Sequence, residues 1–173
     1  MKRVIATAFS LLIVVGATSQ VFAKGTTTKV IITRSDQSPI EISDLEVLKN
    51  FNVWSGPGTF SSGGEGNEVE GKEGFIIDWV SGVVTELPNG LRQFQLSFYV
   101  RYANRPFSEQ KDQLAYIVSY AVDSATGQGY VYLPGKADEP YGLNVKAIYR
   151  AREGNWFRAT TQWQSVFRNV VHH

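Results

Sequence analysis

The chain has 173 residues, of which 43% are hydrophobic, 13% aromatic and 19% charged, and this composition excludes a disordered chain or a coiled coil. It contains no cysteine, which excludes disulfides, a thiol nucleophile and a cysteine-ligated zinc site. The two histidines are His172 and His173, so an internal histidine base, a Ser-His-Asp triad and a histidine-ligated metal are also excluded. We therefore expect no cofactor. Catalysis, if present, would depend on carboxylates, lysine, tyrosine or an oxygen-ligated metal.

Residues 1–23 have the pattern of a secretory signal peptide. A basic start is followed by an apolar run over residues 4–16 and by a small-residue cleavage pattern that ends in Ala23. Cleavage after Ala23 would leave a single domain of 150 residues, 24–173. No transmembrane segment is expected after cleavage, because no other apolar run approaches the roughly 20 residues that a span requires. The predicted location is secreted or periplasmic.

The charged residues are nearly balanced in number but unevenly distributed. The cleaved chain would carry 15 basic and 16 acidic residues, so its charge gives no reason to expect a nucleic-acid partner. Residues 24–90 carry 5 basic and 10 acidic residues, whereas residues 141–173 carry 5 basic residues and 1 acidic residue. One interpretation is that the two ends of the chain attract each other in the fold. The other is an anion-binding patch made of Lys146, Arg150, Arg152, Arg158 and Arg168.

A β-hairpin and a helix are predicted first along the chain. Residues 28–33 and 39–42 are short β-branched segments that are separated by a polar turn, which is typical of a hairpin. Ser43 and Glu46 have the spacing of a capping box, so a short helix is expected to begin there and to end at Asn50.

Residues 52–74 contain seven glycines, one proline and four glutamates, which predicts a long loop that is mobile or covers a ligand. Within it, residues 66–72 have the glycine and lysine spacing of a phosphate-binding loop. However, Glu73 stands where serine or threonine should hold magnesium, and a strand follows where a helix is required. The glutamates also lack the alternating Asp/Asn pattern of a calcium-binding loop. We therefore expect no phosphate or metal site in this loop.

The rest of the chain alternates in the manner of β-strands. Strands are expected over residues 75–80, 82–87, 91–102, 114–123, 129–133, 145–150 and 155–160. The clearest alternation of apolar and polar residues lies in 91–102 and 114–123, and Pro88-Asn89-Gly90 predicts a turn before the first of these. Residues 162–170 fit a short helix or one more strand equally well.

This order of elements predicts a mainly β fold with a minor α component. Strands that follow strands through tight turns indicate an antiparallel sheet. We expect one meander that is curved or barrel-like, with a short N-terminal helix and room for a short C-terminal helix. A two-sheet sandwich is the alternative.

Asp78 interrupts the apolar run 75–80, which is typical of a strand covered on both faces. Burial there would either raise the pKa of this carboxyl or require a cationic partner. A raised pKa would suit the general acid of a glycan hydrolase, with Glu73, Glu86 or Asp123 as the second carboxylate. Asp78 and Glu73 are the candidate catalytic residues under this hypothesis, and a paired structural carboxylate is the other interpretation.

Aromatic residues on polar surfaces suggest a stacking platform for a sugar or another flat ligand. Trp54 lies in the glycine-rich loop, and Tyr99 and Arg101 lie on the polar face of their strand. Tyr130 and Tyr132 share one face of the strand 129–133. These five residues are the predicted ligand-binding residues, and core packing of the aromatic ones is the alternative.

Four short segments resemble, in order, those of a family of small uncharacterised bacterial proteins. They are Trp54-Ser-Gly-Pro-Gly58, Gly74-Phe-Ile-Ile-Asp-Trp79, Ser97-Phe-Tyr-Val100 and Gly127-Gln-Gly-Tyr-Val-Tyr-Leu-Pro-Gly135. The resemblance implies a bacterial origin and one shared domain between about residues 29 and 164. It implies no activity, ligand or functional residue.

The leading functional hypothesis is a secreted or periplasmic β-domain, not an enzyme, that binds a glycan or a protein of the cell envelope or outside the cell. A carboxylate-dependent glycan hydrolase is one alternative. The other is a structural or assembly partner that accepts a strand from another chain at an exposed sheet edge.

Overall fold

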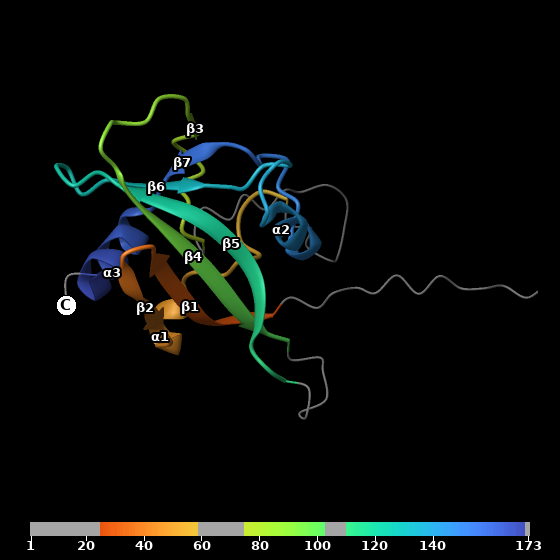
Figure 1. Cartoon of the computed structure of the whole chain (residues 1–173). Helices are drawn as coiled ribbons and strands as arrows, with labels where there is room; N and C mark the ends of the chain where they lie inside the picture. Colours follow the sequence, from red (N-terminus) through yellow and green to blue (C-terminus); the bar gives the residue numbers. More distant parts are fainter. Residues whose placement is uncertain (1–24, 59–74, 103–109, 172–173) are drawn as a thin grey trace, which may run out of the picture.

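The computed structural model describes residues 25–58, 75–102 and 110–171, which form one antiparallel sheet and three helices (Figure 1). The strands are β1 (Thr26–Arg34), β2 (Gln37–Ile42), β3 (Val83–Val84), β4 (Arg92–Arg101), β5 (Gln113–Val122), β6 (Gly129–Tyr132) and β7 (Trp156–Arg158). The helices are α1 (Leu45–Leu48), α2 (Tyr141–Ala147) and α3 (Thr161–Val171). The predicted signal peptide and most of the glycine-rich loop lie outside the described residues.

The strands follow the order β2-β1-β4-β5-β6-β7-β3. The prediction of a mainly β fold with a single antiparallel sheet is therefore confirmed. The described part of the sheet is not closed into a barrel, and its strands form one sheet and not two, so the sandwich alternative is wrong. The chain is also not a simple meander, because β1 pairs with β4 and β3 pairs with β7.

The long central strands form where the alternation predicted them. On β4, Phe94, Leu96, Phe98 and Val100 are buried, because they face the core while their polar neighbours face outward. β5 pairs along the length of β4 and adds four buried residues on the same side, namely Tyr116, Val118, Tyr120 and Val122. The β1–β2 hairpin is confirmed as well.

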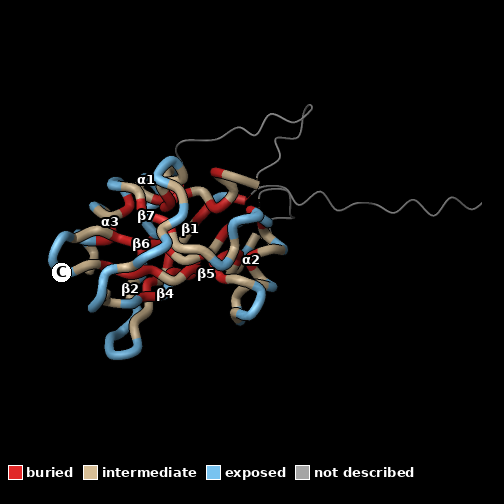
Figure 2. The backbone as a smooth tube through the Cα atoms, turned by 90° about the horizontal axis from the view of Figure 1, so that it is seen from above, coloured by how far each residue is buried: buried red, intermediate tan, exposed pale blue. Residues whose placement is uncertain are grey.

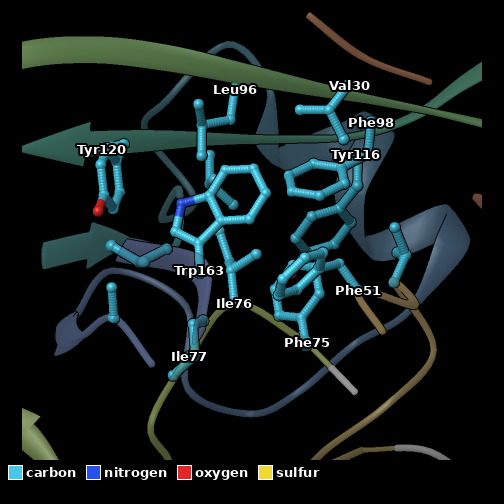
Figure 3. Close-up of a cluster of buried hydrophobic side chains, with 14 of the residues drawn as sticks. Val30, Phe51, Phe75, Ile76, Ile77, Leu96, Phe98, Tyr116, Tyr120 and Trp163 are labelled. Carbon is cyan, nitrogen blue, oxygen red and sulfur yellow. The ribbon is translucent and has the colours of Figure 1, made fainter. Parts of the chain in front are cut away.

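Helix α3 closes the core over this face of the sheet (Figure 3). Its Trp163 is fully buried and packs edge-on against Phe51, with ring centroids 5.0 Å apart. Its Phe167 packs against Phe94 and Tyr120 at 4.9 and 4.5 Å. The buried residues lie in the middle of the molecule, and α2 lies at the opposite end from α3 (Figure 2). Residues 162–170, which fitted a helix or a strand in the sequence, belong to helix α3.

The first helix is shorter than predicted and begins one residue later. Asp44, not Ser43, is the N-cap, and its carboxylate accepts hydrogen bonds from the backbone N–H groups of Glu46 and Val47 at 2.9 and 3.4 Å. The helix then ends after Leu48 and packs against β1.

The predicted strand over 75–80 is wrong, although its burial was expected correctly. Phe75, Ile76 and Ile77 are buried, but only Ile77 forms a bridge, to Ala159 beside the end of β7. The run stops at Asp78, whose side chain accepts hydrogen bonds from the backbone N–H groups of Val80 and Ser81 and so turns the chain. The strand predicted over 82–87 is reduced to the short β3, which pairs with β7.

The predicted strand over 145–150 is wrong, because this segment contributes to helix α2. Pro140 precedes the helix with a φ of −71°, which suits a helix start. Asp138 and Glu139 just before it are further start signals that outweigh the β-branched Val145. In place of the two strands predicted over 145–150 and 155–160, the chain forms a helix followed by the short β7.

Candidate functional site

A pocket of about 300 Å³ opens between the first half of β5, helix α2 and the segment that follows α1. The residues that line it are mostly apolar or aromatic, and they are Trp54, Tyr102, Leu114, Ala115, Leu143, Lys146 and Ala147. Among these, Lys146 is the single charged residue. The volume is at the lower end of the range of about 300–1,000 Å³ for small-molecule sites.

A β-bulge forms the floor of this pocket. Phe98 pairs with Tyr116 while Tyr99 pairs with Leu114, so Ala115 is an extra residue on β5. Bulges of this kind bend a strand and interrupt its ladder. The small side chain of Ala115 leaves space at this point, and the bulge also breaks the strict alternation predicted for 114–123.

The edge of β5 next to the pocket is capped by a side chain. β6 pairs with β5 only from Ser119 onward, so within the described residues no strand covers Ile117 on that side. The buried amide of Asn144 takes that place, with Oδ1 accepting from Ile117 N at 2.8 Å and Nδ2 donating to Ile117 O at 2.6 Å. This pair of hydrogen bonds holds α2 against the sheet and so positions Leu143 and Lys146.

Trp54 also lines the pocket. Its indole N–H donates to Ala147 O at 3.2 Å, and its ring packs edge-on against Tyr102 with centroids 5.9 Å apart. The side chain is half-buried, so part of it packs on the core and part of it lines the pocket. Trp54 is thus the one predicted ligand-binding residue that the structure places in this pocket.

A buried arginine holds the segment that carries Trp54. The Arg150 guanidinium donates to Ser55 O at 2.8 Å, to Pro57 O at 3.0 Å and, by a shorter hydrogen bond, to Val53 O. Its Nε donates to Tyr116 Oη at 3.3 Å. Arg150 is 2% exposed and its guanidinium binds backbone carbonyls, so its charge lies inside the fold and does not face solvent.

Three aromatic rings also surround this cation. The guanidinium carbon lies 4.9 Å from the ring centroid of Phe75, 5.2 Å from that of Trp79 and 5.6 Å from that of Tyr116. Burial raises the pKa of the Tyr116 hydroxyl, and the nearby cation opposes this effect. Burial also lowers the pKa of Arg150, but an arginine starts so high that it stays protonated at neutral pH.

Two glycines allow the segment after Trp54 to approach Trp79 and Tyr149 closely. At Gly58 the φ is +81°, and a Cβ would lie 2.2 Å from Tyr149 O. At Gly56 the φ is +90°, and a Cβ would lie 2.3 Å from the indole nitrogen of Trp79. The Ser-Gly-Pro-Gly sequence therefore has a structural explanation, since a side chain at either glycine would push the chain away from its partners.

The remaining predicted ligand-binding residues do not join Trp54 in one platform. Arg101 forms an ion pair with Asp112 at 2.7 Å, and Lys29 lies over the ring of Tyr99 at 4.8 Å. Tyr130 is 8% exposed and contributes to the interior. The half-buried Tyr132 packs on Trp156 with centroids 5.1 Å apart and donates to Asp138 at 2.9 Å.

The environment predicted for Asp78 is wrong. The residue is not in a buried strand, and Ser81 Oγ donates to its carboxylate at 2.5 Å. This hydrogen bond, together with those from the backbone N–H groups of Ser81 and Val80, lowers the pKa of Asp78, whereas a general acid needs a raised one. Glu73 lies outside the described residues.

The basic residues near the C-terminus do not form one patch. Arg150 is buried, Lys146 lines the pocket at α2, and Arg168 lies on α3 at the other end of the sheet (Figure 1). The sequence analysis missed Leu143 and Asn144 because it did not predict helix α2, and it named Lys146 only as a member of the anion-binding patch. The Asp138-Glu139-Pro140 start signal could have revealed the helix that carries them.

Comparison of the chain with protein-family models, with curated proteins and with solved structures found no match. In the part of the chain that the structure describes, the helices are too short and too polar to cross a membrane. The resemblance to the uncharacterised bacterial family stays a prediction.

Proposed function

We propose that the protein is an exported binding protein whose pocket beside Trp54 holds a small amphipathic ligand with an apolar body and a carboxylate. The observation that supports this proposal is the lining, which combines apolar and aromatic side chains with one ammonium group, that of Lys146. No acidic side chain lines this pocket among the described residues. An anionic head group would therefore meet a complementary charge at the rim.

A glycan fits this lining less well than an amphipathic acid. Sugar rings require several hydrogen-bonding side chains besides an aromatic surface, because their hydroxyl groups must be satisfied when they leave water. The indole N–H of Trp54 already donates to Ala147 O. The pocket thus offers apolar contact along its walls and charge at one point.

Assembly through a sheet edge has less support. Among the described strands, β2 and β3 lie at the two edges. β2 contains Pro39, which cannot donate a backbone hydrogen bond, and β3 has two residues. Both features limit the pairing of another strand at these edges.

The proposal can be tested with octanoate, 1-octanol and cello-oligosaccharides, by calorimetry and by thermal unfolding of the purified protein. Octanoate should bind and raise the melting temperature, since a ligand of the folded state stabilises it. Lys146→Gln should weaken octanoate binding about two- to fivefold, as expected for a partly exposed ion pair, and leave octanol unaffected. Lys136→Gln in the exposed turn before α2 is the matched control.

A second variant fills the pocket. Leu143→Trp on the half-exposed face of α2 should remove octanoate binding without loss of the folded state. Equal octanoate binding by Leu143→Trp and the unmodified protein would place the ligand elsewhere and overturn the proposal. Binding of an oligosaccharide without binding of octanoate would also overturn it and would favour the glycan hypothesis.

Export is a separate part of the proposal. It is supported by the signal-peptide pattern over residues 1–23. When the full chain is expressed in a bacterium, the protein recovered from the periplasm or medium should begin at Lys24. Recovery of the uncut chain from the cytoplasm alone would contradict this part.

A further inference from the structure

A second, smaller pocket of about 110 Å³ lies at the other end of the sheet, where β4 and β5 meet α3. Its lining includes two arginines, Arg92 and Arg168, and the hydroxyl-bearing ring of Tyr120. Neither arginine forms an ion pair with a described acidic residue. This pocket therefore concentrates positive charge that the described fold does not neutralise.

Arg92 points to the core side at the start of β4. It lies two residues before the buried Phe94 and opposite Val122 of β5, so all three share one face of the sheet. The Nε of Arg92 is buried and has no hydrogen-bond partner in the described residues. Buried donors almost always have a partner, and a charged donor without one is especially unfavourable. A missing acceptor at this position is the simplest explanation.

Tyr120 supplies a hydroxyl donor to the lining. The residue is 1% exposed and lies at the edge of the core cluster (Figure 3). Burial raises the pKa of this hydroxyl far above its ordinary value, so it keeps its proton and can donate. The hydroxyl lies beside Gly129, where a Cβ would come within 2.0 Å of its oxygen, so the glycine provides the space that the hydroxyl needs.

Arg168 covers the pocket from α3. Its Nη2 lies 3.5 Å from the position that a Cβ would take at Gly127, in the turn between β5 and β6. Arg168 and Tyr120 both line this pocket.

Asp123 and Gln164, two other polar residues of this lining, already form hydrogen bonds within the fold. Asp123 accepts from Ala125 N at 2.9 Å and from Thr126 Oγ1 at 2.7 Å. Gln164 donates to Ala159 O at 2.8 Å and accepts from Gly129 N at 3.4 Å. With Asp123 counted against the two arginines, the lining keeps a net positive charge.

We propose that Arg92, Arg168 and Tyr120 form a binding site for a phosphate group, either free or at the end of a larger molecule. The planar N–H forks of two arginines match the oxygens of phosphate, and the phenolic hydroxyl supplies a further donor. The site lies at the opposite end of the sheet from the pocket beside Trp54 and does not depend on the function proposed for that pocket.

The test compares the purified protein in phosphate and in chloride buffers of equal pH and ionic strength, by thermal unfolding and by ³¹P NMR titration. Phosphate should raise the melting temperature and show saturable binding. Arg168→Gln, at an exposed position, should weaken phosphate binding about tenfold, as expected from the loss of a charge-assisted hydrogen bond. The matched control is Arg152→Gln, an exposed arginine away from this pocket.

Two interior variants keep the test decisive. Tyr120→Phe keeps the ring and should weaken phosphate binding several-fold. Arg92→Met should remove the phosphate-dependent rise in melting temperature, and it should not lower the melting temperature in chloride, because it removes an unpaired buried donor.

Glycerol phosphate distinguishes the two sources of the group. Binding much tighter than that of inorganic phosphate would indicate a terminal phosphate on a larger molecule, and equal binding would indicate the free ion. The proposal is overturned if ³¹P NMR detects no binding, if acetate binds in place of phosphate, or if phosphate stabilises Arg168→Gln and Arg92→Met as much as the unmodified protein.

Discussion

The replacement Arg150→Met tests whether a buried cation holds the segment that builds the pocket wall. Methionine keeps much of the apolar stem but removes all the donors, so the carbonyls of Val53, Ser55 and Pro57 lose their partner. An unsatisfied buried carbonyl costs about 1 kcal/mol or more, so three of them give about 3 kcal/mol at least. The lost contacts with three aromatic rings add to this value.

The loss is offset because a methionine need not be removed from water as a cation must. We therefore expect the free energy of unfolding to fall by about 3 kcal/mol, the value that follows from the three carbonyls left without a donor. At about 2–4 °C per kcal/mol for a domain of this size, the melting temperature should fall by roughly 10 °C.

Urea denaturation followed by tryptophan fluorescence measures this change. Arg152→Met is the control, because Arg152 is two residues away and exposed, and it should change the free energy of unfolding by less than about 0.5 kcal/mol. The free energy of unfolding of Arg150→Lys should lie between those of Arg150→Met and Arg152→Met, since an ammonium keeps the charge but not the planar fork. A loss of less than 1 kcal/mol for Arg150→Met would refute the conclusion that these hydrogen bonds hold the segment.

Two further predictions concern the helix α2 and the turn at Asp78. Asn144→Asp keeps the acceptor for Ile117 N but loses the donor to Ile117 O, so it should lower the free energy of unfolding at pH 7 by about 2–4 kcal/mol. Part of this loss should be recovered in acid, where a protonated carboxyl can donate. A loss that does not depend on pH in urea titrations would contradict the edge-capping role. Hydrogen bonds from Ser81 lower the pKa of Asp78, so the contribution of this carboxylate to stability is present above its unfolded pKa of about 4 and is lost as the pH falls through the folded pKa. The free energy of unfolding of Asp78→Asn should therefore decline less steeply below pH 4 than that of the unmodified protein. An unchanged slope would refute this prediction.

The central strands could be predicted because their signal is local. In β4 and β5 the alternation of side chains along the chain is itself the pattern of burial, so neighbouring residues contain the information. The same holds for the β1–β2 hairpin and for the turn at residues 88–90 that precedes β4. These elements, and the antiparallel arrangement that short connections impose, needed no knowledge of distant contacts.

The candidate site could be predicted only in part. Trp54 was identified because an aromatic residue among glycines is unusual, and the structure places it in the pocket. Leu143 was missed because helix α2 was not predicted, and Lys146 was named only as a member of the anion-binding patch. Asp78 was misjudged because an apolar run on both sides of an acid suggests a buried strand, whereas here the acid ends the run by binding the following N–H groups.

The sequence by itself determined the central strands β4 and β5, the β1–β2 hairpin and the mainly β class of this protein, since these depend on the order of side chains over a few residues. Tertiary structure alone decided that residues 75–77 cross the core without joining a strand, that Asn144 caps β5 and that Arg150 binds three carbonyls nearly one hundred positions earlier. The physical reason is that a buried polar group needs a partner, and the chain segment that supplies it is determined only when the whole fold closes.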